Sequence, residues 1–101
     1  MSEQKTPSPA EPVPDDAVPR INPMYLFRWE ERQQAYLLLY PEGIVKLNGS
    51  AGEILRRCDG STCVSGIVAD LERSFGATDL REDVQRFLET SHAKGWIRLD
   101  A

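Results

Sequence analysis

The chain has 101 residues, with 12 Lys and Arg against 16 Asp and Glu, and its formal charge of −4 opposes general attraction to nucleic-acid phosphates. Leaving out the Pro-rich start, about 80 residues remain, which is enough for one modest core. The sequence has neither an apolar run long enough to cross a bilayer nor a secretory signal, so we expect a cytoplasmic protein without membrane contact.

Residues 1–19 are predicted to form a disordered, Pro-rich tail, because Pro, Ser, Glu and Asp dominate there and large apolar side chains are nearly absent. A single folded domain is then expected over residues 20–101. The tail is open to two interpretations, a solvated terminus, which composition favours, or a docking arm for a partner.

Three strands are predicted at the start of the domain. Residues 25–29 alternate with the period of a strand that has one buried face, and residues 35–40 form a short run rich in Leu and Tyr. Pro and Gly in residues 40–43 favour a type I turn, and a third strand should follow over residues 44–47.

Two helices with apolar stripes are predicted next. Ser50 and Glu53 have the spacing of a capping box, which indicates a first helix that ends near residues 59–60. Apolar residues recur at helical spacing over residues 64–75, and Gly76 is suited to end this second helix in a left-handed conformation.

A third helix is predicted from a capped start at Asp79 and Glu82 to Gly95, followed by an extended segment over residues 96–99. These elements together indicate an α+β fold of the winged-helix-like kind, with a three-stranded antiparallel sheet followed by three helices.

Side chains suited to catalysis are scarce in this sequence. His92 is the only histidine and is expected on a helix surface. Cys58 and Cys63 lack the further ligands that a zinc site needs, and in a cytoplasmic chain they are expected as reduced thiols. We therefore expect no catalytic residue, no metal and no cofactor.

Several short strings stand in one order along the chain, LYPEG at residues 39–43, VKLN at 45–48, ILRRCDG at 54–60, IVADL at 67–71 and KGW at 94–96. Together they resemble the PqqD family of pyrroloquinoline quinone biosynthesis, from about Arg20 onward. Two positions depart from the family pattern, since Cys63 and Gly66 stand where a Thr and an acidic residue usually open the second helix. Ser61 or Thr62 could cap that helix instead.

The resemblance implies a peptide chaperone without catalytic activity, which binds the ribosomal precursor peptide PqqA and presents it to the radical S-adenosylmethionine enzyme PqqE. It also implies that the leader adds as a strand beside the third strand and packs against the third helix. The residues expected to bind the peptide are therefore Ile44, Val45, Lys46, Leu47 and Asn48 of the strand and Arg81, Val84, Phe87, Leu88 and Ser91 of the helix.

Three further possibilities remain open. One is a winged-helix DNA-binding regulator, for which the acidic Asp70 and Glu72 make the second helix a poor surface. Another is an enzyme or redox protein that uses Cys58 and Cys63. An open strand edge could also pair with a second copy of the chain to form a homodimer.

Overall fold

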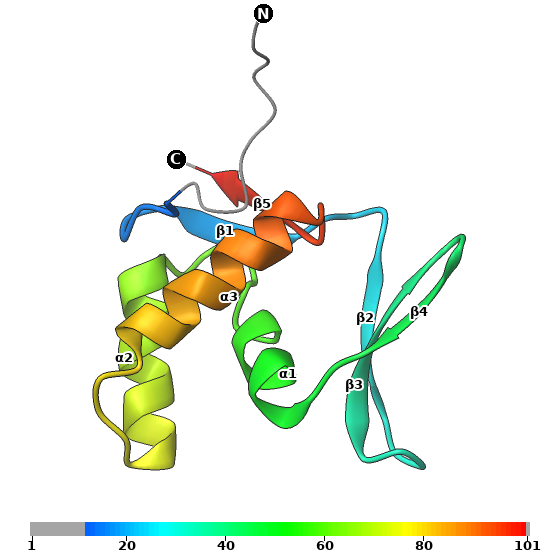
Figure 1. The fold of residues 1–101 in the computed structure, drawn as a ribbon, viewed down its shortest axis with the longest axis horizontal. Coiled ribbons are helices and arrows are strands. Elements are labelled where there is room, and N and C mark those ends of the chain that lie inside the picture. The colour runs from blue at the N-terminus through cyan, green and yellow to red at the C-terminus, as the bar shows by residue number, and fades with distance from the viewer. Residues whose placement is uncertain (1–11, 101) are drawn as a thin grey trace, which may run out of the picture.

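The computed structural model describes residues 12–100, which form an α+β domain (Figure 1). A three-stranded antiparallel sheet precedes three helices, so the predicted fold class is confirmed. The elements in chain order are β1 Val18–Ile21, β2 Leu26–Glu30, β3 Ala35–Tyr40, β4 Gly43–Lys46, α1 Gly49–Leu55, α2 Val64–Phe75, α3 Arg81–Ala93 and β5 Ile97–Asp100.

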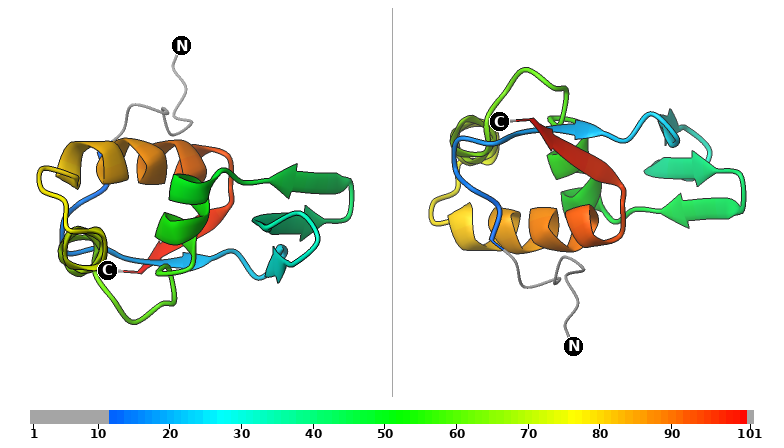
Figure 2. Two further views of the ribbon diagram at one scale, coloured as in Figure 1. Left: turned by 90° about the horizontal axis from the view of Figure 1, so that it is seen from below. Right: turned by 90° about the horizontal axis from the view of Figure 1, so that it is seen from above.

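The main sheet has the strand order β2–β3–β4, with both pairs antiparallel. Phe27, Leu38 and Val45 stand opposite one another in the register, and all three contact the main core. This row therefore defines the inner face of the sheet. Figure 2 shows that the sheet projects to one side of the helical body.

A second, two-stranded sheet joins the two ends of the domain. β1 pairs antiparallel with β5, with Val18 opposite Asp100 and Ile21 opposite Ile97. The prediction of extended structure near the C-terminus is correct, but the sequence analysis missed its partner strand, because the two strands are separated by most of the chain.

The predicted disordered tail must be corrected for residues 12–19, which are packed against the domain. Val13 and Ala17 are 1% and 6% exposed and belong to the core. The carbonyl groups of Asp15 and Ala17 accept hydrogen bonds from the backbone N–H groups of Ser65 and Val64. The rest of the predicted tail, residues 1–11, lies outside the described residues.

The apolar stripes of the helices form the core as predicted, but the caps at the starts of all three helices differ from the prediction. Asn48, not Ser50, caps α1, because its side-chain oxygen accepts a bond of 2.8 Å from the N–H of Ala51. α2 begins after Cys63 without a side-chain cap, so neither Ser61 nor Thr62 fills that role, and it ends at Gly76 with φ of 59° as predicted.

Asp79 does not cap α3 either. Its own backbone has φ of 60°, and the helix starts after Leu80. The N–H of Leu80 instead donates a bond of 3.0 Å to the carboxylate of Glu72, which reaches across from α2. The link between α2 and α3 is thus fixed by a contact between helices, which short-range spacing in the sequence does not reveal.

Two properties of the described part of the chain bear on function. Among residues 12–100, none of the helices has the length and apolarity that crossing a bilayer requires. Over the same residues, no group of three His, Cys, Asp or Glu side chains is arranged to hold a metal ion, and Cys58 and Cys63 are free thiols.

Candidate functional site

Strand β4 lies at the edge of the main sheet. It pairs with β3 on one side, and no strand of residues 12–100 pairs with its other side. The N–H of Leu47 donates to the carbonyl of Tyr36 at 3.0 Å, so alternation along the antiparallel ladder turns the N–H and C=O groups of Val45 towards β3 as well. The backbone groups of Ile44 and Lys46 therefore point away from the sheet and are free to pair with another strand.

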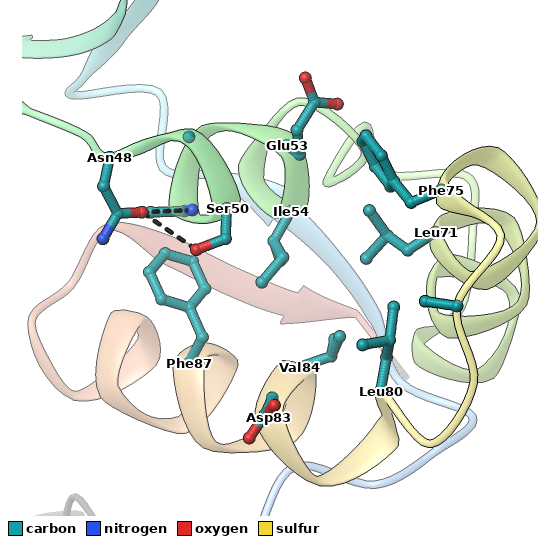
Figure 3. Close-up of a pocket in the computed structure, with 13 residues that line it drawn as sticks. Asn48, Ser50, Glu53, Ile54, Leu71, Phe75, Leu80, Asp83, Val84 and Phe87 are labelled. Atoms are coloured by element: carbon teal, nitrogen blue, oxygen red, sulfur yellow. Dashed lines mark hydrogen bonds between the residues drawn. The ribbon is translucent and has the colours of Figure 1, made fainter.

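An open groove of about 710 Å³ lies among the three helices (Figure 3). Its walls are mainly apolar, and the side chains of α1, α2 and α3 point towards a shared space in Figure 3. The apolar residues that line it are Ala51, Ile54, Leu71, Phe75, Ala77, Leu80, Val84 and Phe87. A space of this size and character is typical of sites that hold one or two apolar side chains of a ligand.

The polar side chains at the groove rim are already engaged with neighbours. The Glu53 carboxylate pairs with Arg57 at 2.8 Å and with Arg56 at 3.5 Å. Asp83 pairs with Arg86 at 3.2 Å. Because these acids are partly neutralised, apolar contact is the main interaction that the groove offers.

Asn48 connects the free edge to the groove. It follows β4, caps α1 and lines the groove, so the end of β4 and the groove lie next to each other at this residue (Figure 3). The candidate site therefore combines backbone groups along the edge with apolar side chains in the groove.

Comparison with known proteins identifies the family. The family model described as coenzyme PQQ synthesis protein D (PqqD) matches residues 35–97, which include β3, β4 and all three helices. The chain belongs to the PqqD family.

Curated relatives match about four fifths of the chain. The PqqA binding protein of Pseudomonas aeruginosa is 47% identical over 85 residues, which cover 83% of this chain and 92% of that protein. The PqqA binding protein of Methylococcus capsulatus is 42% identical over 83 residues, covering 82% and 89% of the two chains.

A solved structure shows the same fold. The PqqD truncation of Methylobacterium extorquens PqqCD, described as a functional and stand-alone recognition element for ribosomally synthesized and post-translationally modified peptides, superimposes with a TM-score of 0.66. The match covers 90% of this chain and 93% of that one at 24% identity, so it supports the fold alone.

On the β4 side of the candidate site, the predicted residues fall into two groups. Ile44 is 63% exposed and Lys46 is also exposed, beside the free edge. Val45 packs against the core, and Leu47 is 4% exposed, so their side chains support the strand from the inner face. The side chain of Asn48 is occupied by the cap of α1.

On α3, only two of the five predicted residues line the groove. Val84 and Phe87 do so, and Phe87 is the more exposed of the two. Leu88 and Ser91 are fully buried in the domain interior. Arg81 points elsewhere and forms an ion pair with Asp15 of the N-terminal segment.

The sequence analysis missed the contribution of α1 and α2 to the groove, above all that of Phe75. Phe75 is the last residue of α2 and is 57% exposed, although it continues the buried stripe of that helix. The signal was present in the sequence, because an aromatic residue directly before the terminating Gly76 has little of its own helix left to pack against. The groove around it depends on how α2 and α3 meet, which the pattern does not predict.

Proposed function

We propose that this protein binds the precursor peptide PqqA by strand addition to β4 and presents it to the radical S-adenosylmethionine enzyme PqqE. The observation that carries the proposal is the free edge of β4 lying next to the apolar groove at Asn48. The relatives are named PqqA binding protein, which supports the choice of peptide.

The free edge provides attachment with little sequence preference. Ile44 and Lys46 each offer one donor and one acceptor, so an added strand can form up to about four backbone hydrogen bonds of ~1 kcal/mol each. Micromolar affinity requires ~8 kcal/mol. Backbone pairing alone therefore leaves roughly half of the binding free energy to side chains.

The groove supplies the remaining free energy and the selectivity. Each apolar side chain that is fully buried contributes ~1.5 to 3 kcal/mol, so two such anchors close the difference before the cost of ordering the peptide. Phe75 and Phe87 lie on different helices that line the groove and offer aromatic surface to an incoming side chain.

Presentation requires only that the peptide be held in place. An adaptor that fixes the leader raises the effective concentration of the peptide at the enzyme, and the chemistry belongs to PqqE. In this proposal the domain itself supplies the backbone edge, the apolar anchors and a rigid support for both.

Replacing Lys46 tests strand addition directly. Lys46→Pro removes the outward N–H at the free edge, a position where proline is tolerated because no bond to β3 is lost. Isothermal titration with synthetic PqqA should show a loss of affinity of about fivefold to tenfold. Lys46→Ala is the matched control, since it removes the charge and keeps the N–H. Equal affinities of the two variants would exclude pairing at this edge.

Replacing Phe75 tests the groove. Phe75→Ser removes an exposed aromatic wall with little effect on the buried core and should weaken PqqA binding by roughly tenfold. Met24→Ser is the control, because Met24 is equally exposed and is not part of the groove lining. A similar loss in both variants would count against a specific role of the groove.

A further inference from the structure

The main sheet has an outer face that is turned away from the core. Residues opposite one another in the register share a face, and neighbours along a strand alternate between faces. Since Phe27, Leu38 and Val45 form the inner row, the adjacent rows lie on the other side. We call this surface the outer face, and it contains Leu26, Arg28, Leu37, Leu39, Ile44 and Lys46.

The outer face is apolar across all three strands, and its apolar residues are accessible on the two edge strands. Leu26 and Ile44, at the two ends of one row across the sheet, are 58% and 63% exposed. Leu37, on the central strand, is 6% exposed and does not belong to the main core cluster. In both views of Figure 2 the helices and the β1–β5 pair lie to one side of this sheet. An apolar row across three strands that is exposed at both ends is typical of a protein contact surface.

The charges next to this apolar row are mainly basic, although the chain as a whole is acidic. Arg28 and Lys46 stand on either side of Leu37 in the register. Glu30, farther along β2, is 4.0 Å from Arg28 and neutralises it only in part. The surface therefore fits an apolar partner surface bordered by Asp or Glu side chains.

A second copy of the chain fits this face poorly. In a symmetric dimer the same patch meets itself, so the Arg28 and Lys46 side chains of both copies would be brought together. The formal charge of −4 on each copy adds to the repulsion. The geometry thus favours a different protein as the occupant.

The outer face is continuous with the free edge of β4, since Ile44 and Lys46 belong to both. A peptide strand added there would extend the outer face by one strand. We infer that the enzyme that modifies the bound peptide docks on the outer face, with an apolar, acid-bordered surface, next to the peptide that it receives. The inference rests on the proposed function for the identity of this enzyme.

The test compares binding of two partners to the same variants of the full chain. Leu26→Ser and Arg28→Glu change the outer face on β2, which is the edge strand farthest from the free edge of β4. Purified PqqE is titrated into wild type and each variant, and synthetic PqqA is titrated separately. We expect both variants to weaken PqqE binding by tenfold or more and to change PqqA affinity by less than twofold. Phe75→Ser should show the reverse pattern.

Three results would overturn the inference. One is unchanged PqqE affinity in folded Leu26→Ser and Arg28→Glu, or no PqqE binding by wild type. Another is an equal loss of PqqA affinity in these variants, which would mean that the face is part of the peptide site. The third is a wild-type dimer in sedimentation that Leu26→Ser dissociates. Failure of wild type to bind PqqA would instead refute the proposed function, whether or not PqqE binds.

Discussion

The ring of Tyr36 on β3 lies against the Cα atom of Gly52 in α1, and a Cβ atom at Gly52 would be only 2.5 Å from Cδ2 of Tyr36. The same ring stacks on Phe27 with centroids 4.8 Å apart and meets Trp29 edge-on at 4.9 Å. This contact sets how the sheet, and with it the β4 edge, is held against α1.

Gly52→Ala should therefore destabilise the domain. Overpacking costs ~1 to 3 kcal/mol, which exceeds the gain of about 1 kcal/mol from placing Ala in a helix. Gly49→Ala is the matched control, because it lies in the same helix with no atom within 4 Å of the new Cβ. Thermal unfolding followed by circular dichroism should show a lower Tm for Gly52→Ala alone. Equal Tm values for the two variants would argue against the close contact.

Truncation tests the packed residues 12–19. Deleting residues 1–19 removes the core side chains of Val13 and Ala17, two backbone bonds to the start of α2 and the first half of β1, Val18 and Pro19. The free energy of unfolding should fall by several kcal/mol, which is a large part of the ~5 to 15 kcal/mol that is typical of a folded domain. Deleting residues 1–11 keeps all of these contacts and is the control. If urea unfolding gives the same midpoint for both truncations, residues 12–19 add nothing to stability.

Ser91→Ala should stabilise the protein. Ser91 is fully buried in α3, and its hydroxyl has no hydrogen-bond partner within residues 12–100. Removing an unsatisfied hydroxyl and placing Ala in a helix should together raise the free energy of unfolding by ~1 kcal/mol. Thr90→Ala, at the exposed neighbouring position, controls for helix propensity. PqqA affinity should stay unchanged in Ser91→Ala, and a clear loss would restore Ser91 as a peptide-binding residue.

The two thiols should react at very different rates. Burial, with a smaller contribution from Asp59, raises the pKa of the Cys58 thiol to about 12. A hydrogen bond with Ser65 lowers the pKa of the Cys63 thiol below its ordinary value. Because the thiolate is the reactive form, iodoacetamide near pH 8 should label Cys63 alone in the native protein and both thiols in urea. Rapid labelling of native Cys63→Ser would contradict the burial of Cys58.

Acid stability should depend on the pair between Arg57 and Asp70, whose atoms Nε and Oδ2 are 2.6 Å apart. The hydrogen bond from Arg57 is the main reason that the pKa of Asp70 is lowered. A lowered folded-state pKa adds stability above the unfolded value of about 3.9, and this stability is lost as the pH falls through the folded-state pKa. Urea unfolding of Asp70→Asn between pH 5 and pH 3 should therefore show a smaller pH dependence than wild type. A pH dependence in Asp70→Asn equal to that of wild type would mean that this ion pair does not contribute to acid stability.

Much of the fold was predictable because it depends on local pattern. The run at residues 35–40 coincides with β3, and the stripe at residues 64–75 coincides with α2 and its end at Gly76. The pairing of β1 with β5 and the bond from Leu80 to Glu72 were not predictable in this way, since each joins residues far apart in sequence. The predicted cap of α1 was wrong for a different reason. Asn48 and Ser50 lie two residues apart and both can cap a helix, so the sequence does not decide between them.

The candidate site was predictable at its edge and less so in its groove. Ile44 and Lys46 were expected beside an open flank and lie there, because the strand order follows the order of the chain. Leu88 and Ser91 were expected to bind the peptide but are fully buried, since an apolar stripe does not reveal which of its residues face the core and which face a gap between helices. That distinction depends on the three-dimensional arrangement of α1, α2 and α3.

The β1–β5 pair has a practical consequence for how the domain can be attached to other polypeptides. Val18 stands opposite Asp100, so the chain leaves β5 beside the start of β1, away from β4 (Figure 1). A carrier, a label or an enzyme can thus be fused after β5 without covering the free edge of β4.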